Sequence, residues 1–233
     1  MSELFSIQLQ NRQQQSRDGV WLDLPTTTEQ VQAALRQIGI SSDNPQGLFI
    51  SGYFAEEEKR FAIPYNMVLA SNVDELNFLA SRLETLSTGE RAELNAALQA
   101  PQSELFSIGR ITDFPENVDY YVHLPDVHGP AQLGDYYLNR SGMVDMPEEW
   151  KGGIDTAQFG RYVAQQEQGA FTQYGYLVKS GDEWQKVHEG QPVPEEYRVL
   201  SFPVPEVMRD AANIPPPVQP ETEPQKVIPI ILN

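Results

Sequence analysis

The sequence predicts an α+β fold: an elongated chain of about three small lobes built from short antiparallel sheets and helices, with a Pro-rich disordered C-terminal tail. Strand-like runs alternate along the chain with helices whose caps can be identified from the residues. Apolar residues make up 40% of the 233 residues, which is enough to build buried cores. Eight of the 18 prolines lie between Pro203 and Pro229, so this last part is not expected to fold on its own.

The first lobe, residues 1–60, is expected to be a small α+β unit. Gly19–Leu24 is strand-like. Thr26 and Glu29 have the spacing of a capping box, and Gly39 ends the helix that they begin. The apolar stripe of this helix consists of Val31, Leu35 and Ile38. A second strand-like run and then a loop with three consecutive glutamates complete the unit; they are Gly47–Phe54 and Glu56–Glu58.

A helical middle lobe is expected over residues 61–101. Asn72 with Glu75, and Ser87 with Glu90, have the spacing of two further capping boxes. Leucines follow each box at helical intervals, which is the pattern of a buried helix face. These leucines are Leu76, Leu79, Leu83 and Leu86 in the first helix and Leu94 and Leu98 in the second.

The third lobe, residues 102–202, is expected to be an acidic α+β unit, followed by the Pro-rich tail, residues 203–233. Its elements, in chain order, are a strand over Asp119–Leu124, helices over Ala131–Leu138 and Thr156–Gln166, and a strand over Phe171–Lys179.

A short repeat links the first and third lobes. The hexapeptide Ser-Glu-Leu-Phe-Ser-Ile occurs at Ser2–Ile7 and again at Ser103–Ile108, and a Leu-Pro pair recurs at Leu24-Pro25 and Leu124-Pro125. The repeat indicates either a duplicated strand unit or a chance likeness between two strands, because the copies diverge at the other positions.

The charge is strongly negative. Thirty-three Asp and Glu residues stand against 16 Lys and Arg, which gives a net charge of −17. Such a chain repels phosphate backbones, so direct binding of DNA or RNA is not expected. The charge serves either solubility or a cationic partner. It is concentrated between Asp113 and Asp155, where nine acids accompany only Arg140 and Lys151.

Catalytic and metal-binding patterns are scarce, and we expect neither an enzyme nor a cofactor. No nucleotide-binding, metalloprotease or nucleophile-elbow motif occurs, and the absence of cysteine excludes disulfides and thiolate chemistry. His123, Asp126 and His128 lie close together in the sequence, but their spacing matches no closed zinc site. With no signal peptide and no long apolar run, a soluble, cytoplasmic protein is expected.

Carboxylates on regular elements can be spaced as phosphates are. Neighbours on one strand face lie roughly 6.6 Å apart, and neighbours on a helix face about 5–6 Å apart. Each DNA strand carries about one charge per 3.4 Å of helix axis. Composition therefore permits imitation of DNA without selecting it.

An ordered set of motifs carries a family resemblance. From about residue 19 to 180 the chain resembles ArdA-type antirestriction proteins. The motifs are Gly19–Pro25, Asn72–Leu86, Tyr120–Asp126, Leu133–Tyr137, Pro147–Trp150, Ile154-Asp155, Phe159–Arg161 and Gly169–Tyr176. The stretches before residue 18 and after residue 202 lie outside the resemblance.

The resemblance implies a function without catalytic residues. Proteins of this family come from mobile elements, including those spread by conjugation, and block Type I restriction-modification enzymes by imitating bent B-form DNA. It also implies a homodimer, a methyltransferase core as the partner, and an inhibitory surface of distributed acids. In this chain these would be Asp113, Glu116, Asp119, Asp126, Asp135, Asp145, Glu148, Glu149 and Asp155.

Three other functions stay open from the residues alone. The protein could be an acidic adaptor of a mobile element, with its charge serving solubility and its tail recruiting a partner. It could inhibit a different DNA-binding defence nuclease. A small hydrolase would have to use a carboxylate pair or a metal held by His123, Asp126 and His128.

Overall fold

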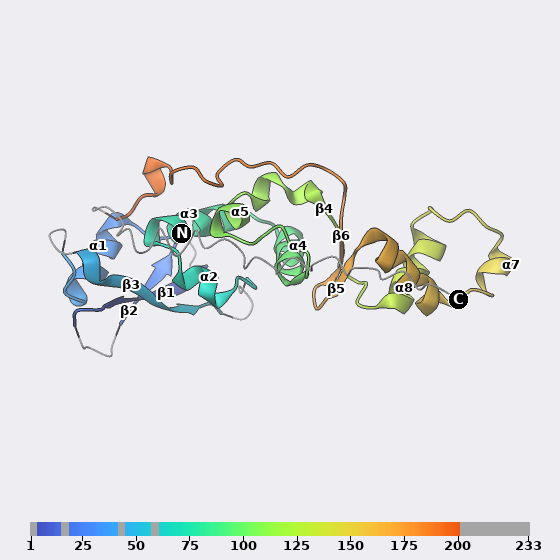
Figure 1. Ribbon diagram of the computed structural model, residues 1–233, viewed down its shortest axis with the longest axis horizontal. Coiled ribbons are helices and arrows are strands. Elements are labelled where there is room, and N and C mark those ends of the chain that lie inside the picture. The colour runs from blue at the N-terminus through green and yellow to red at the C-terminus, as the bar shows by residue number, and fades with distance from the viewer. Residues whose placement is uncertain (1–3, 15–18, 42–44, 57–60, 201–233) are drawn as a thin grey trace, which may run out of the picture.

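The computed structural model describes residues 4–14, 19–41, 45–56 and 61–200, and they form an elongated molecule (Figure 1). A sheet with helix α1 lies at one end, helices α3, α4 and α5 lie in the middle, and helices α6, α7 and α8 form the other end. The expected combination of helices and short antiparallel sheets is confirmed. The Pro-rich tail lies outside the described residues, as do Ser2, Glu57 and Glu58.

The first sheet has β1 at its centre. Strands β1 (Phe5–Asn11), β2 (Val20–Leu24) and β3 (Leu48–Phe54) pair antiparallel in the order β2-β1-β3. The two strand-like runs in the first lobe are thus confirmed as β2 and β3. Strand β1 begins within the first copy of the hexapeptide, which the repeat indicated as a strand, and runs on to Asn11. Its side chains alternate between the core and the outer face as in any half-buried strand.

Helix α1 (Thr28–Gln37) covers one face of this sheet, and its cap differs from the predicted one by one residue. Thr27 is the N-cap, and its capping-box partner is Gln30, in place of Thr26 and Glu29. Thr26 instead donates its backbone N–H to Asn77 Oδ1 at 2.7 Å. Because that hydrogen bond holds Thr26 in the turn after β2, the first free capping position is Thr27.

The middle of the chain is helical. After the 3-10 turn η1 (Pro45–Gly47) and β3, it contains α2 (Tyr65–Leu69), α3 (Val73–Leu83), α4 (Thr88–Gln99) and α5 (Ile108–Thr112). Both predicted capping boxes are confirmed, at the starts of α3 and α4. The leucines of their apolar stripes are buried or half-buried.

The repeated hexapeptide takes two different structures. Its first copy enters β1 at Phe5, whereas its second copy is a loop that ends with Ser107 as the N-cap of α5. The expectation of a strand at Ser103–Ile108 is wrong. In β1 the sequence is held by two neighbouring strands, whereas in the second copy the Ser107 side chain accepts the Arg110 N–H and starts a helix.

The second sheet follows two 3-10 turns, η3 (Phe114–Glu116) and η4 (Val118–Tyr120). Strands β4 (Tyr121–Leu124), β5 (Ala170–Thr172) and β6 (Gly175–Lys179) pair antiparallel in the order β4-β6-β5. The single strand predicted over Phe171–Lys179 is therefore a hairpin. Its turn enters β6 at Gly175, whose φ of +118° is readily adopted only by glycine.

Between β4 and β5 lie the helices of the far end. They are α6 (Pro130–Asp135), which continues into the π-helical turn η5 (Tyr136–Arg140), then α7 (Glu148–Lys151) and α8 (Thr156–Glu167). The two predicted helices are confirmed, the first with the wider π-helical turn at its end. We call residues 125–169 the distal lobe.

Two clusters of buried side chains hold the molecule together. The larger cluster runs from Leu4 to Val199 and includes buried residues from each of the three lobes expected from the sequence. The smaller cluster, around Val127, Leu133, Ala164 and Tyr176, holds the distal lobe. We call the part built on the larger cluster the proximal body. The three-lobe division with its boundaries stays a prediction.

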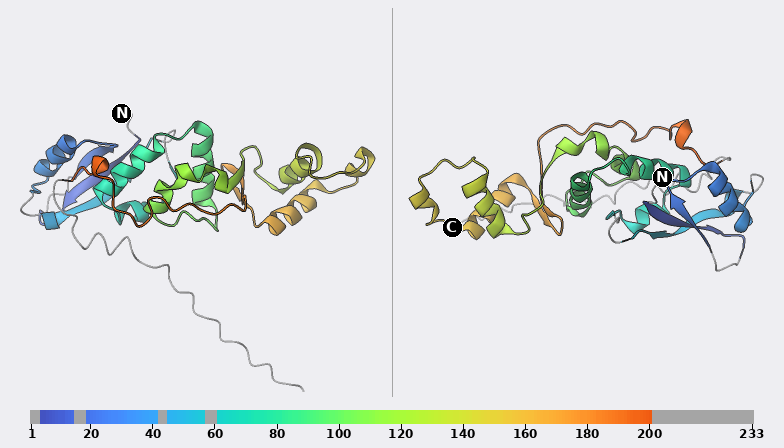
Figure 2. Two further views of the ribbon diagram at one scale, coloured as in Figure 1. Left: turned by 90° about the horizontal axis from the view of Figure 1, so that it is seen from above. Right: turned by 180° about the vertical axis from the view of Figure 1, so that it is seen from behind.

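Residues 180–200 return along the length of the proximal body (Figures 1 and 2). This segment, which we call the strap, contains only the 3-10 turn η6 (Glu195–Tyr197) and was not predicted. Buried polar side chains of the proximal body bind its backbone. The Val199 and Leu200 N–H groups donate to Asp74 Oδ1 at 2.8 and 2.9 Å, and Asn77 Nδ2 donates to the Tyr197 carbonyl at 3.0 Å.

Candidate functional site

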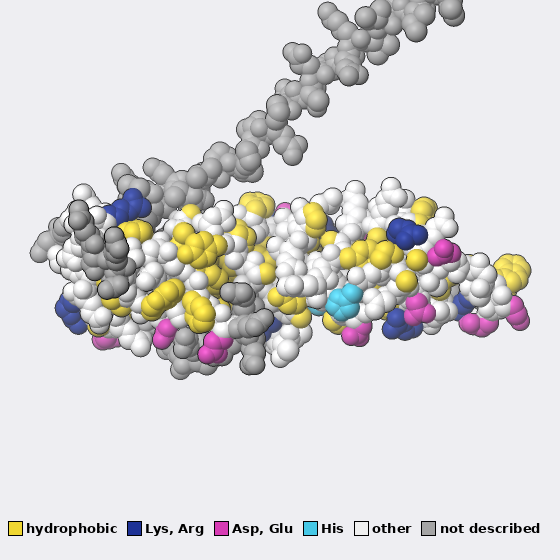
Figure 3. Space-filling model, turned by 90° about the horizontal axis from the view of Figure 1, so that it is seen from below, with side chains coloured by type: hydrophobic (Ala, Val, Ile, Leu, Met, Phe, Trp, Pro, Cys, Tyr) yellow, Lys and Arg dark blue, Asp and Glu magenta, His cyan; other side chains and the backbone are white. Residues whose placement is uncertain are grey.

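Most of the predicted surface acids lie on or beside the distal lobe. Asp119 is in η4, Asp126 follows β4, Asp135 ends α6, and Asp145 lies in the loop before α7. Glu148 and Glu149 begin α7 and Asp155 is the N-cap of α8. All of these except the half-buried Asp135 are exposed. Acidic side chains recur toward the distal end of the face shown in Figure 3, whereas hydrophobic side chains gather over the proximal part.

The two bases among these acids are both used locally. Arg140 forms an ion pair with Asp135 at 2.9 Å, and Lys151 with Glu148 at 2.6 Å. Within the described part of the chain, Asp119, Asp126, Asp145 and Glu149 form no ion pair. The surface therefore keeps an excess of uncompensated carboxylates, which attracts cationic groups and weakens as salt rises.

Asp113 does not belong to this surface. Its side chain is completely buried and accepts the backbone N–H groups of His188 at 2.6 Å and Glu189 at 3.2 Å. An exposed position was expected because the sequence shows the charge but not the strap that covers it. Glu116 is half-buried and paired with Arg82 of α3, so its charge is largely compensated.

Two of the resemblance motifs meet through their glycines. A Cβ atom added at Gly134 of α6 would lie 1.9 Å from the Thr156 carbonyl oxygen, and one at Gly160 of α8 would lie 1.8 Å from that of Pro130. These contacts let the two helices pack backbone to backbone. The glycines of the motifs Leu133–Tyr137 and Phe159–Arg161 thus build the support of the acidic surface, to which Asp135 of the first motif adds a carboxylate.

Two other motif residues meet at Glu167. Its carboxylate accepts the hydroxyl groups of Tyr137 and Tyr176, the second at 2.9 Å. Burial and the hydrogen bond to this carboxylate raise the pKa of both tyrosines, so both stay neutral donors. The pair joins η5 and β6 to the end of α8 and makes the lobe a fixed support for its acids.

The histidines have structural surroundings. His123 Nε2 lies 2.7 Å from the Tyr174 carbonyl oxygen, and the backbone N–H of His128 donates to Gln132 at 2.7 Å. Among the described residues, no group of three or more His, Asp or Glu side chains is arranged to hold a metal ion. Across the same residues, none of the helices combines the length and apolar character needed to cross a membrane.

The strap adds acids that sequence reasoning missed. Asp182, Glu183, Glu195 and Glu196 are exposed along it, on the outside of the proximal body. No periodicity marks the strap, because its backbone is bound by side chains and not by a neighbouring strand. The strap backbone is bound by four Asp and Asn side chains, namely Asp74, Asn77, Asp113 and Asn117. Nothing in the sequence distinguishes these four from Asp and Asn residues at the surface, so the strap could not be predicted from them.

The chain matches a known protein family over most of its length. The family model described as antirestriction protein (ArdA) matches residues 14–178. No curated protein sequence matches the chain. The matched region begins after β1, contains β2, β3 and the whole distal lobe, and ends one residue before β6 does. Because the match covers well over half of the chain, the protein belongs to the ArdA family of antirestriction proteins.

Proposed function

We propose that this antirestriction protein inhibits Type I restriction-modification enzymes by imitating B-form DNA and occupying their DNA-binding groove. The observation that carries the proposal is the excess of exposed carboxylates on the distal lobe, where Arg140 and Lys151 are already paired with acids. The third base of the lobe, Arg161 of α8, is exposed and leaves the carboxylates in clear excess. A groove that binds DNA presents Lys and Arg side chains, which such a surface can engage in place of phosphates. The protein needs no catalytic group and no cofactor for this, and it acts in the cytoplasm.

The contact surface in this proposal consists of exposed or half-buried acids of the chain. From the predicted set these are Glu116, Asp119, Asp126, Asp135, Asp145, Glu148, Glu149 and Asp155. The elongated body supports the same proposal, because a rod can follow a groove for much of its length (Figure 2). A homodimer would double that length. The methyltransferase core is the part of the enzyme that we propose as the partner.

A competition experiment tests this function. The protein is bound to a purified Type I methyltransferase core, and duplex DNA is added in excess while the salt concentration is varied. We expect DNA to displace the protein and the affinity to fall steeply between roughly 50 and 200 mM salt. Capture that ignores both DNA and salt would favour an acidic adaptor instead. If the protein inhibits only another defence nuclease, and does so in a salt-sensitive way, the proposed target is wrong and the proposed imitation of DNA stands.

A charge-matched pair of variants tests the surface. The distal variant carries D145N, E148Q, E149Q and D155N, and Asn at position 155 keeps a good helix N-cap. The control carries D23N, E29Q, E56Q and E84Q, which removes the same charge from the proximal body. We expect inhibition to weaken at least tenfold in the distal variant and much less in the control. Equal losses in both would mean that net charge alone matters.

A further inference from the structure

The second sheet is the wall between the two cores. Its side chains alternate, so that Tyr121 and Leu177 belong to the larger cluster while Tyr176 belongs to the smaller one, with Leu124 and Val178 packed against it. The distal lobe therefore joins the proximal body through one sheet of three short strands. Such a thin connection leaves the angle between the two parts to be fixed by additional contacts.

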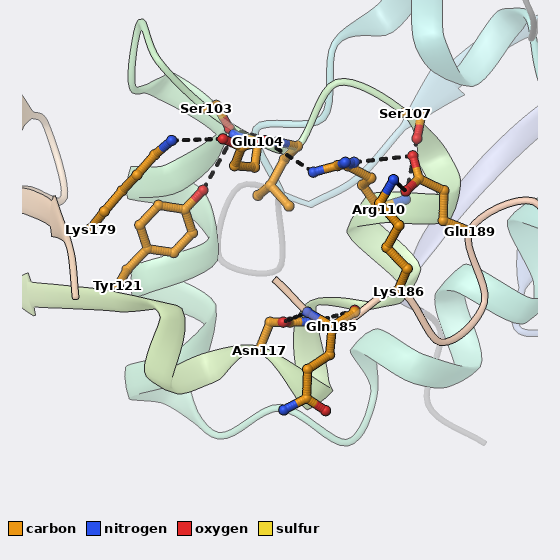
Figure 4. Close-up of polar contacts among 11 residues, drawn as sticks. Ser103, Glu104, Ser107, Arg110, Asn117, Tyr121, Lys179, Gln185, Lys186 and Glu189 are labelled. Carbon is orange, nitrogen blue, oxygen red and sulfur yellow. Dashed lines mark hydrogen bonds and ion pairs between the residues drawn. The ribbon is translucent and has the colours of Figure 1, made fainter. Parts of the chain in front are cut away.

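A series of alternating charges runs beside this wall (Figure 4). Lys179, the last residue of β6, pairs with Glu104 at 2.6 Å. Glu104 pairs with Arg110 of α5 at 3.0 Å, and Arg110 pairs with Glu189 of the strap at 3.0 Å. Lys186 lies 3.5 Å from Glu189 and ends the series. We call these five side chains the ionic chain.

Arg110 is the centre of the ionic chain and is shielded from water. Its side chain is 9% exposed, and its guanidinium lies 4.5 Å from the ring centre of Phe106 and 5.9 Å from that of Trp184. A charge in such surroundings binds its partners strongly, and loss of Glu104 would leave Arg110 with Glu189 as its one remaining carboxylate in the ionic chain. Hydrogen bonding from Lys179 lowers the pKa of Glu104, so the acid stays ionised beside both cations.

The strap end of the ionic chain is itself held in place. The Glu189 backbone N–H donates to the buried Asp113 carboxylate, and Asn117 exchanges two hydrogen bonds with the Gln185 backbone at 2.7 and 3.0 Å. Glu189 is therefore fixed to the proximal body on the strap side of Arg110. Lys179, at the other end, belongs to the sheet that carries the distal lobe.

We propose that Arg110 is a positioning residue, and that the ionic chain fixes the angle between the distal lobe and the proximal body. The carboxylates of the distal lobe then keep a constant position relative to those on the strap. A pre-organised surface loses less entropy on binding than one that must be ordered by its partner. The benefit for binding rests on the proposed function, whereas the fixed angle does not.

The angle can be measured directly, because the chain has no cysteine of its own. Spin labels are attached to cysteines introduced at the exposed positions Gln37 on α1 and Gln165 on α8, and the distribution of distances between them is recorded. We expect one narrow distribution in the parent and one at least twice as broad in Glu104→Gln. Glu183→Gln, which removes the same charge from an exposed strap position, should leave the width unchanged.

A milder variant covers the case in which Glu104→Gln does not fold. Lys179 is 42% exposed, so Lys179→Gln should fold while it breaks the link to the sheet. If the distribution stays as narrow as the parent's in Lys179→Gln and in any Glu104→Gln protein that folds, the proposal is overturned. The double variant should broaden it no further than Glu104→Gln alone, because Glu104→Gln already breaks the pair with Lys179 that Lys179→Gln removes.

Inhibition of the methyltransferase core is measured on the same proteins. A broadened distribution with weaker inhibition supports both the fixed angle and its role in binding. A broadened distribution with unchanged inhibition supports the claim that the ionic chain fixes the angle and rejects a role of that angle in binding. Weaker inhibition with a narrow distribution rejects the claim that the ionic chain fixes the angle and leaves the proposed function standing.

Discussion

The backbone N–H of His188 donates to Asp113 Oδ1 at 2.6 Å, although the two residues are 75 positions apart. The other carboxylate oxygen accepts the next N–H, so one buried side chain satisfies two backbone donors of a segment that has no strand partner. Buried backbone donors must find acceptors. The position of the strap therefore depends on the acids and amides buried beneath it.

Asp113→Asn should destabilise the protein by about 1–3 kcal/mol, because the uncharged amide keeps one acceptor oxygen for two N–H groups and turns a donor nitrogen toward the other. Chemical denaturation of the purified variant measures this loss. Asp126→Asn, at an exposed position, should change the stability by less than about 0.5 kcal/mol. Equal stabilities of parent and Asp113→Asn would show that the strap is held by other contacts.

Gly160→Ala should weaken the distal lobe by about 1–3 kcal/mol or more, because the new methyl group meets the Pro130 carbonyl and cannot move away from it. Hydrogen exchange in α6 and α8 should become faster than in the parent. Gly89→Ala is the matched control, since no atom lies within 4 Å of a Cβ added there and alanine favours the helix. A variant at position 160 with parental exchange rates would contradict the close helix packing.

Glu93 should make the protein less stable in alkaline solution. Burial, and then repulsion from Glu90 and Asp119, raises its pKa to about 8 from an unfolded value near 4.5. A folded state that holds its proton more tightly than the unfolded state loses stability as pH rises from 4.5 through 8. Glu93→Gln should remove this loss, so its advantage over the parent should grow between pH 5 and pH 9 in thermal denaturation.

A constant difference between Glu93→Gln and its parent over that range would mean that Glu93 titrates normally. Asp126→Asn serves as the control, because its carboxylate is exposed and a single charge is removed.

Neutralising the strap acids should weaken inhibition, because we expect them to extend the acidic surface along the proximal body. The variant carries D182N, E183Q, E195Q and E196Q, which leaves the buried anchors and the ionic chain intact. Inhibition and its salt dependence are compared with the parent's. A shallower salt slope is expected with the loss of affinity. Parental values for both would limit the contact surface to the distal lobe.

The predictable part of the fold is local in sequence. The boxes at Asn72 and Ser87 involve residues three apart, so the pattern alone identifies the starts of α3 and α4. The same reasoning erred by one residue at Thr27, where a side chain from α3 takes the Thr26 N–H. A contact across 51 positions decided that helix start, and no local rule contains it.

The acidic surface was predictable to the extent that charge decides exposure. Exposed acids such as Asp145 and Glu149 fit the usual behaviour of an ionised side chain. Asp113 is the exception, because the strap supplies the hydrogen bonds that make burial of a carboxylate possible. The hexapeptide repeat shows the same for strands, since Phe5–Ile7 begin β1 in the first copy, whereas Ser107 of the second copy is a helix N-cap.

The strap also sets the order in which the protein can be completed during synthesis. Asp74 accepts an N–H from a residue 125 positions later, which makes this contact one of very high sequence separation. At a translation rate of roughly 5–20 residues per second, α3 leaves the ribosome about 6–25 s before its partner. Until then the Asp74 carboxylate lacks the strap N–H groups that it accepts in the finished fold. The contacts of α3, which is synthesised early, are therefore completed only when the strap has been synthesised.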